Sequence, residues 1–417
     1  MKKIGLIAIS ASLVIVIASV FAFNLSQNPT TEKTVPVKLA DDKNYTAERL
    51  SSIVDSLNTF NFNFYQEISE NKNVFFSPYS IFVALSMAYE GARGNTADQM
   101  YSILNILQND SATRGSFGRL YNLLNQNKEG YNISTANAFW AQQNYPFLPN
   151  YINILESYYM AEANELDFSN NVEAARIINN WIENHTNNKI KNMIDPGALS
   201  EFTRLVLTNA IYFKGLWANQ FNPENTHKAD FKITQNTTTE VDMMSLSDTK
   251  FNYTETDDLQ IIKLPYKGNN LSMIIILPKE NNISIAESEL NAVNLTSWIN
   301  SLKETEINVN IPKFKIETEY NLNDVLKKMG MTDAFSVAAD FSGMDGTKDL
   351  YISDVVHKAF VEANEEGTEA AAATGVIMTL KAVLYSFNAD HPFVFLIQHE
   401  ETGAILFMGK VMNPSTD

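Results

Sequence analysis

The spacing of apolar residues changes along the chain from a helical to a strand-like period. Within residues 174–189, for example, Ile178 and Ile182 share one helical face with other apolar side chains. Later segments are short, rich in β-branched or aromatic residues and bounded by Pro, Gly or Asn, which is typical of strands. The helical pattern covers residues 80–90, 97–107 and 174–189, and the strand pattern covers residues 205–213, 271–277, 307–311, 380–387 and 393–397. Helices segregated from strands predict an α+β fold with a large mixed sheet.

Three segments have a pattern that differs from simple amphipathic spacing. Residues 271–277 and 393–397 are almost continuously apolar, so we expect both faces of these strands to be buried. Phe60, Phe62 and Phe64 alternate as in a strand, whereas the positions around them have helical spacing. The period alone leaves both assignments open for this segment.

The N-terminus has the pattern of a secretory signal. Two lysines precede an apolar run over residues 4–23, and the small residues around Ala22 allow cleavage after it, which gives a signal peptide over residues 1–22. The run is also nearly long enough to span a bilayer, so an uncleaved membrane anchor is the alternative. Residues 23–45 are polar and predict a flexible tether. We expect the rest of the chain to be secreted or extracellular, or tethered to the membrane by residues 4–23.

Composition excludes several classes of protein. The chain has 417 residues of which 45% are hydrophobic, enough for a large core. Its 31 Lys and Arg against 48 Asp and Glu leave a net charge of −17, which argues against nucleic acid and heparin-like polyanions as partners. The chain has no cysteine, so disulfides, Cys-based metal sites and a Cys nucleophile are excluded.

No catalytic motif stands out. Residues 399–403 begin as a zinc-binding HExxH pattern but have Gly at the fifth place, and residues 115–118 are one residue short of a GxSxG nucleophile elbow. Residues 91–94 lack the lysine and the preceding strand of a phosphate-binding loop, and residues 340–346 lack the alternating acidic ligands of a calcium loop. A triad can still assemble across long sequence separations. We interpret the isolated histidines as structural and expect no enzyme activity, cofactor or metal.

Residues 365–381 are compatible with two conformations. In a short surface helix, Thr368 is the N-cap, an alanine run follows and Gly375 ends the helix. Counted by twos, the same stretch has an uncharged strand face made of Thr368, Ala370, Ala372, Thr374, Val376, Met378 and Leu380. A segment that suits both an exposed loop and a buried strand is a candidate switch.

Ordered motifs from about Thr46 to Pro414 resemble those of the serpin family. The longest is LTNAIYFKGLW at residues 207–217. The others are NVFFSPYSI at 73–81, GARGNT at 91–96, INNWIENHT at 178–186, IPKF at 311–314, HKA at 357–359, EEGTEAA at 365–371, HPFVF at 391–395 and FMGKV at 407–411. Each motif is weak alone, but together and in order they are specific.

The resemblance implies one domain over residues 46–417 with the serpin fold: three β-sheets, eight or nine helices and an exposed reactive loop. It also implies a mechanism in which a serine protease attacks one bond of the loop. The cut loop then enters the main sheet as a new strand and carries the acyl-enzyme to the far end. Serpin loop insertion is itself a standard example of strand addition and of stored strain. The uncleaved state is then metastable and held kinetically.

The hinge of the loop determines whether a serpin inhibits. The resemblance assigns to it Glu365, Glu366, Gly367, Thr368, Glu369, Ala370, Ala371, Ala372, Ala373 and Thr374. The face to be buried has neither a charge nor a proline, either of which would slow insertion. We therefore expect a monomeric inhibitor without a cofactor, and a non-inhibitory chaperone or carrier is the alternative. Residues 97–135 carry few basic side chains and give no support for the glycosaminoglycan site of the family.

Supporting positions follow by the same resemblance. The shutter beneath the middle of the main sheet matches Ser77, Ser80, Asn209 and His357, among which we expect hydrogen bonds. The breach, where the loop first enters the sheet, matches Trp217. Lys313 and Glu365 match the pair that pins the top of the loop.

The resemblance to serpins also predicts Lys381–Ala382 as the reactive bond. Family loops most often place the cleaved residue sixteen positions after the hinge glutamate, and 365 + 16 = 381. Counting back eleven positions from Pro392 gives the same residue. A lysine suits a trypsin-like protease, whose specificity pocket carries a carboxylate. The alternatives are cleavage by a chymotrypsin-like enzyme after Leu380, or by an elastase-like enzyme after Met378 or Ala382.

Overall fold

The computed structural model describes residues 38–106, 110–125, 130–368 and 385–415, and the statements below concern these residues. They belong to the compact unit Val37–Asp417. Its α-helices are α1 (Ala47–Ile68), α2 (Pro78–Gly91), α3 (Gly94–Leu104), α4 (Ser111–Asn125), α5 (Pro149–Tyr158), α6 (Asn171–His185), α7 (Ile283–Glu289), α8 (Ala292–Ser301), α9 (Asn323–Lys328) and α10 (Ser342–Asp345). Eight or nine helices were expected, and the described part has ten because α10 is a single short turn.

Local sequence explains where the first helices begin. The hydroxyl of Thr46 accepts a hydrogen bond from the Arg49 N–H and caps α1, and Ser77 caps α2 in the same way. Phe60, Phe62 and Phe64 lie inside α1 and are all buried, so the helical assignment holds. The alternation arose because this part of α1 is enclosed on more than one side, and apolar residues therefore fall outside a single stripe.

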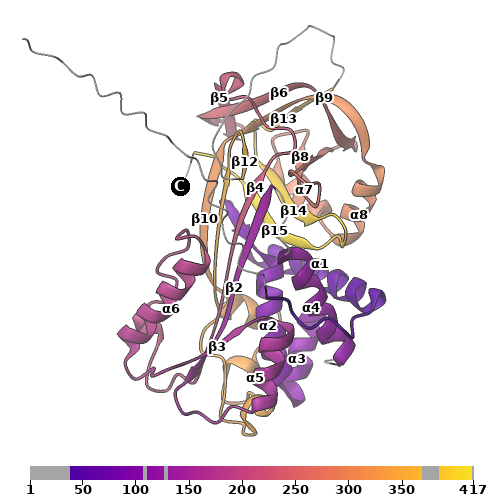
Figure 1. Cartoon of the computed structure of the whole chain (residues 1–417). Helices are drawn as coiled ribbons and strands as arrows, with labels where there is room; N and C mark the ends of the chain where they lie inside the picture. Colours follow the sequence, from indigo (N-terminus) through magenta and orange to yellow (C-terminus); the bar gives the residue numbers. More distant parts are fainter. Residues whose placement is uncertain (1–37, 107–109, 126–129, 369–384, 416–417) are drawn as a thin grey trace, which may run out of the picture. The chain divides into compact units, whose positions relative to one another are not determined.

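Two continuous hydrogen-bonded sheets form the body of the domain (Figure 1). The six-stranded sheet has the order β10 (Phe314–Asn321), β11 (Val356–Ala363), β12 (Gly367–Thr368), β4 (Leu205–Leu216), β2 (Tyr131–Gln142) and β3 (Glu162–Leu166). The nine-stranded sheet contains β1 (Val74–Phe76), β15 (Ile405–Val411), β14 (Phe393–His399), β8 (Leu271–Pro278), β7 (Leu259–Pro265), β6 (Thr237–Glu255), β9 (Lys303–Pro312), β13 (Ser386–Asn388) and β5 (His227–Thr234).

The nine-stranded sheet corresponds to two of the three sheets that were expected. β6 and β9 are long enough to belong to both, and their mutual register shifts at an irregularity between Leu246 and Thr249. The half of β6 before this irregularity pairs with β5, and the half after it pairs with β7. An interrupted register lets the strands bend, so one hydrogen-bonded path serves two differently oriented layers.

The expected buried strands are confirmed. Every residue of β8 and β14 is buried, and the two strands pair antiparallel in the centre of their sheet. The segments at 205–213 and 307–311 are the strands β4 and β9. Of the strand expected at 380–387, the described part contains only its end, in β13.

Helices cover the two faces of the six-stranded sheet differently. α6 packs on one face through a cluster that contains Ile178 and Ile182 together with Trp140 of β2 and Ala210 of β4. The opposite face joins the main core with α1 to α5 and the nine-stranded sheet. Figure 1 shows α6 apart from the group α1–α5.

Residues 38–45 do not belong to the polar tether in which the sequence placed them. Ala40 is buried, and its N–H and C=O both bond to the side chain of Asn122 in α4, at 2.8 and 3.1 Å. The N–H of Asp41 also donates to the Ser157 carbonyl at 2.8 Å. The Asn122 amide thus pairs both backbone polar groups of the buried Ala40, which would otherwise be costly to remove from water. These hydrogen bonds hold a mostly polar segment against α4.

Candidate functional site

In the six-stranded sheet, β4 and β11 pair along only part of their length. These strands pair in parallel over only four positions, from Asn209 with His357 to Tyr212 with Phe360. Beyond that point the two-residue strand β12 lies between them: Thr368 pairs antiparallel with Gly215 on one side and Ala363 on the other (Figure 1). The first residues of the predicted switch segment therefore already occupy the sheet.

A tight turn brings the chain from β11 into β12. Asn364 and Gly367 bond to each other through both backbone groups, at 2.9 and 3.3 Å. A Cβ atom on Gly367 would overlap the carbonyl oxygen of Gly215, so only glycine fits so close to β4.

Glu365 is held in this turn by two side chains. Its carboxylate lies 3.0 Å from the Lys313 ammonium and accepts a hydrogen bond from the Thr226 hydroxyl at 2.8 Å. Burial alone would raise the pKa of Glu365, but the hydrogen bonds and the positive charge of Lys313 outweigh it and hold the pKa below its ordinary value. The pKa of the neighbouring Glu366 is raised, mainly by partial burial, and the attraction of Lys214 does not offset this.

Trp217 anchors the backbone of the same turn. Its indole N–H donates to the Asn364 carbonyl at 2.9 Å, and its backbone N–H donates to the Glu366 carbonyl at 2.7 Å. The Phe221 N–H donates to the remaining carbonyl, that of Glu365, at 2.8 Å. The ring stacks on Tyr266 with centroids 4.7 Å apart, which fixes the orientation of the indole.

The polar residues predicted for the shutter lie around the first of the four β4–β11 pairs, that of Asn209 with His357. His357 is buried, and its Nε2 accepts the Ser77 N–H at 3.0 Å. The Ser77 hydroxyl accepts the Ser80 N–H at 3.1 Å and donates to the Leu406 carbonyl at 2.7 Å. Asn209 is directly opposite His357 in the register, but its side chain lies outside the described residues. Within the described part, His357 Nδ1 has no partner.

Burial keeps His357 uncharged. Removal from water lowers the pKa of its imidazole to about 3. The neutral ring can accept the Ser77 N–H, and a charged one could not.

Several predicted residues fall outside the described part of the chain. These are Glu369, Ala370, Ala371, Ala372, Ala373, Thr374 and the bond Lys381–Ala382. Sequence reasoning also missed two partners that the fold supplies, Thr226 for Glu365 and Tyr266 for Trp217. Neither belongs to a motif with the residue it supports, so only the register of the sheets brings them together.

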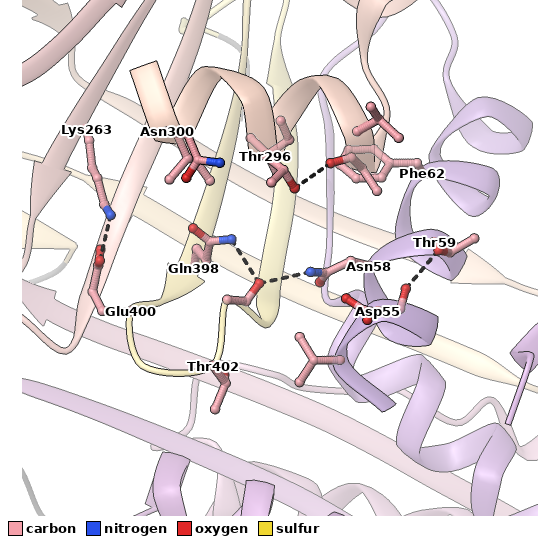
Figure 2. Close-up of a pocket in the computed structure, with 16 residues that line it drawn as sticks. Asp55, Asn58, Thr59, Phe62, Lys263, Thr296, Asn300, Gln398, Glu400 and Thr402 are labelled. Carbon is pink, nitrogen blue, oxygen red and sulfur yellow. Dashed lines mark hydrogen bonds and ion pairs between the residues drawn. The ribbon is translucent and has the colours of Figure 1, made fainter. Parts of the chain in front are cut away.

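A surface groove of about 660 Å³ lies between α1, α8 and the turn after β14. Figure 2 shows that its polar groups bind one another: Asn58 and Gln398 both donate to the Gly403 carbonyl at 2.9 Å. Lys263 and Glu400 form an ion pair at 2.6 Å in the same wall. The groove therefore presents few unpaired polar groups to a ligand.

The described residues contain neither a metal-binding cluster nor a membrane-spanning helix. No group of three or more His, Cys, Asp or Glu side chains there could hold a metal ion. None of the helices in the same ranges is both long and apolar enough to cross a bilayer.

A family model described as "Serpin (serine protease inhibitor)" matches residues 55–414. The chain belongs to the serpin family. An uncharacterised serpin-like protein of Thermococcus kodakarensis is 44% identical over 371 residues, which cover 87% of this chain and 86% of the relative. Intracellular coagulation inhibitor 2 of Tachypleus tridentatus is 43% identical over 354 residues, which cover 82% of this serpin and 86% of the relative.

Solved structures share the fold over their whole length. Human thyroxine-binding globulin in complex with its hormone has a TM-score of 0.81 at 31% identity, covering 88% of this serpin and 100% of that chain. The loop-inserted structure of a cleaved ovalbumin variant has a TM-score of 0.79 at 32% identity, covering 87% and 100%. The expected serpin fold is thus confirmed.

The lowered pKa of Glu365 predicts an acid-sensitive turn. A carboxylate whose pKa is depressed in the folded state adds stability above its unfolded pKa, and this stability is lost as pH falls through the folded value. We expect the urea midpoint of the native protein to exceed that of E365Q at pH 7 and the difference to vanish toward pH 3. E366Q is the matched control, because the raised pKa of Glu366 predicts a difference of the opposite sign. A pH-independent gap for E365Q would contradict the ionic role of Glu365.

Proposed function

We propose that this serpin is a secreted, monomeric suicide inhibitor of trypsin-like serine proteases. In this proposal the reactive loop is cleaved after Lys381, and residues from Glu369 onward enter the sheet between β4 and β11. The acyl-enzyme is carried along and trapped. The observation that carries the proposal is the four-pair closure of β4 on β11 with β12 already seated above it.

The register of β12 predicts where each inserted residue would lie. Thr368 pairs with Gly215 and Ala363, so Thr374, six positions on, would lie between 215 − 6 = 209 and 363 − 6 = 357. Asn209 and His357 already face each other in the register, so the two sides agree. A continuous strand 4 is therefore compatible with both neighbours without a bulge.

The same register assigns the faces of the inserted strand. Ala370 and Ala372 would lie level with Val361 and Ala359 of β11, which belong to the main core. The even-numbered residues from Thr368 to Thr374 would thus be buried in that core, and they are small and uncharged. Glu369 would point to the other face, toward α6. Burying an unpaired charge costs several kcal/mol, so this distribution favours fast insertion.

Insertion would also improve the hydrogen bonding of the sheet. It replaces four parallel β4–β11 pairs by two antiparallel ladders, and antiparallel pairing is slightly more stable per residue. Roughly ten residues at ~3.3 Å each would displace an attached protease by tens of ångströms. A sheet that gains a strand only after cleavage is metastable before it.

A carrier function is the second candidate. The groove between α1 and α8 has the size of a small-molecule site, and one similar structure is a thyroxine carrier. The mutual pairing of its polar groups gives less support than the sheet does for inhibition.

Secretion rests on the sequence of residues 1–23, which lie outside the described part. The apolar run after two lysines supports export. One relative is by its name an intracellular inhibitor, so N-terminal sequencing of protein recovered from the medium and from cells tests this part separately.

Incubation with trypsin tests trapping. The unmodified serpin should form a complex that survives SDS. T368R should be cleaved but should give at least about tenfold less complex, because a charged residue in β12 would disturb the register from which the inserted strand must extend. T368V keeps the size of the side chain without the charge and should still trap. Equal complex yield from T368R and T368V would refute insertion.

Cleavage of the loop should stabilise the protein. About ten new strand residues bring roughly ten or more hydrogen bonds worth ~1 kcal/mol each, so the melting temperature should rise by more than about 10 °C. Calorimetry before and after limited proteolysis measures the shift. An unchanged melting temperature would favour the carrier.

Mass spectrometry of the released C-terminal peptide locates the cleaved bond. A fragment that starts at Ala382 is expected with trypsin, because a lysine before the bond fits the acidic specificity pocket. A fragment that starts at Lys381 would instead indicate a chymotrypsin-like target.

A further inference from the structure

We propose that Phe360 of β11 and Lys189, in the connection from α6 to β4, form a strap that sets the rate of loop insertion. This inference rests on the proposed inhibitory function and names residues that control its conformational step.

Insertion divides into two stages at Phe360. β12 ends at the level of Gly215 and Ala363, and the highest β4–β11 pair is Tyr212 with Phe360. The two levels between them have no β4–β11 pair, so residues 369 and 370 can fill them without breaking any. Residue 371 is the first to displace an existing pair, since 368 + 3 = 371, 215 − 3 = 212 and 363 − 3 = 360. The barrier therefore begins at Phe360.

The ring of Phe360 is also contacted by two lysine ammonium groups. Its ring is 6% exposed, and the Lys189 ammonium lies 5.3 Å from the ring centroid. Lys315 of the neighbouring strand β10 lies 6.0 Å from the same centroid. Ammonium groups at these distances are attracted to the face of an aromatic ring.

The connection that carries Lys189 packs mainly on the β2 and β4 side of the future gap, and it also touches β11, where the Lys358 ammonium donates to the Lys191 carbonyl at 3.1 Å. Ile190, Met193 and Ile194 belong to the cluster that joins α6 to β2 and β4. Phe360 belongs to β11. A strand added between β4 and β11 moves them apart by about 4.8 Å, one strand spacing. The contact between Lys189 and Phe360 spans this gap and must be lost.

The strap predicts that removal of either member accelerates insertion. K189M keeps the apolar stem without the charge, and F360L keeps apolar bulk without the aromatic face. Each should raise the rate about two- to fivefold, the size expected for one cation–π contact. The double variant should be no faster than the faster single one, because both remove the same interaction. K191M is the matched control in the same connection and should leave the rate unchanged, because the Lys191 side chain is exposed and its contact with Lys358 of β11 is made by the backbone carbonyl, which the substitution keeps.

Two rates measure the effect in the full-length protein. One is the uptake of a synthetic peptide with the sequence of residues 369–380 by the uncleaved protein, followed on native gels. The other is the formation of the SDS-stable complex with trypsin. Circular dichroism and urea midpoints first establish that the variants fold.

The outcomes separate the strap from the function on which it rests. Faster uptake and trapping in both single variants, without further gain in the double one, support the strap. Unchanged rates in K189M and F360L, with a normally trapping parent, overturn it, as do additive effects in the double variant. A parent that neither traps trypsin nor takes up the peptide overturns the proposed inhibition, and the strap with it.

Discussion

The closure of β4 on β11 constrains the rest of this serpin. Four parallel pairs hold the six-stranded sheet shut, whereas every other contact of β4 and β10 with the long strands beside them is an antiparallel ladder. The sheet could accept one more strand, and the register of β12 fits that strand to both neighbours. In the proposed mechanism, main-chain geometry would therefore favour the inserted arrangement once the loop is cut.

At the upper end of this closure, the turn at residues 364–367 is held in place by hydrogen bonds. The three carbonyls of Asn364, Glu365 and Glu366 are all bonded to the segment around Trp217 and Phe221. Lys313, between β9 and β10, and Thr226, directly before β5, hold the Glu365 side chain. In the proposed mechanism, the entering strand would therefore extend from Thr368 in one register.

The other end of the β4–β11 closure, at His357, is a cluster of buried polar side chains. Ser77 satisfies its hydroxyl through Leu406 and Ser80, and His357 stays neutral because it is removed from water. His357 Nδ1 has no partner among the described residues, and in the proposed inserted state it would lie level with Thr374. A polar pair formed only after insertion would stabilise the final state without strengthening the closed one.

The sequence by itself determined the local features. Continuous apolar runs predicted the buried strands β8 and β14, and ordered motifs identified the family. Tertiary structure decided what period and motif do not encode. Phe60, Phe62 and Phe64 are helical because α1 is enclosed by several elements, and residues 38–45 dock through the amide of Asn122. Thr226 reaches Glu365, and Lys189 reaches Phe360, only because sheet register and the path after α6 bring distant segments together. Such contacts depend on the relative placement of whole elements, which no local pattern of residues specifies.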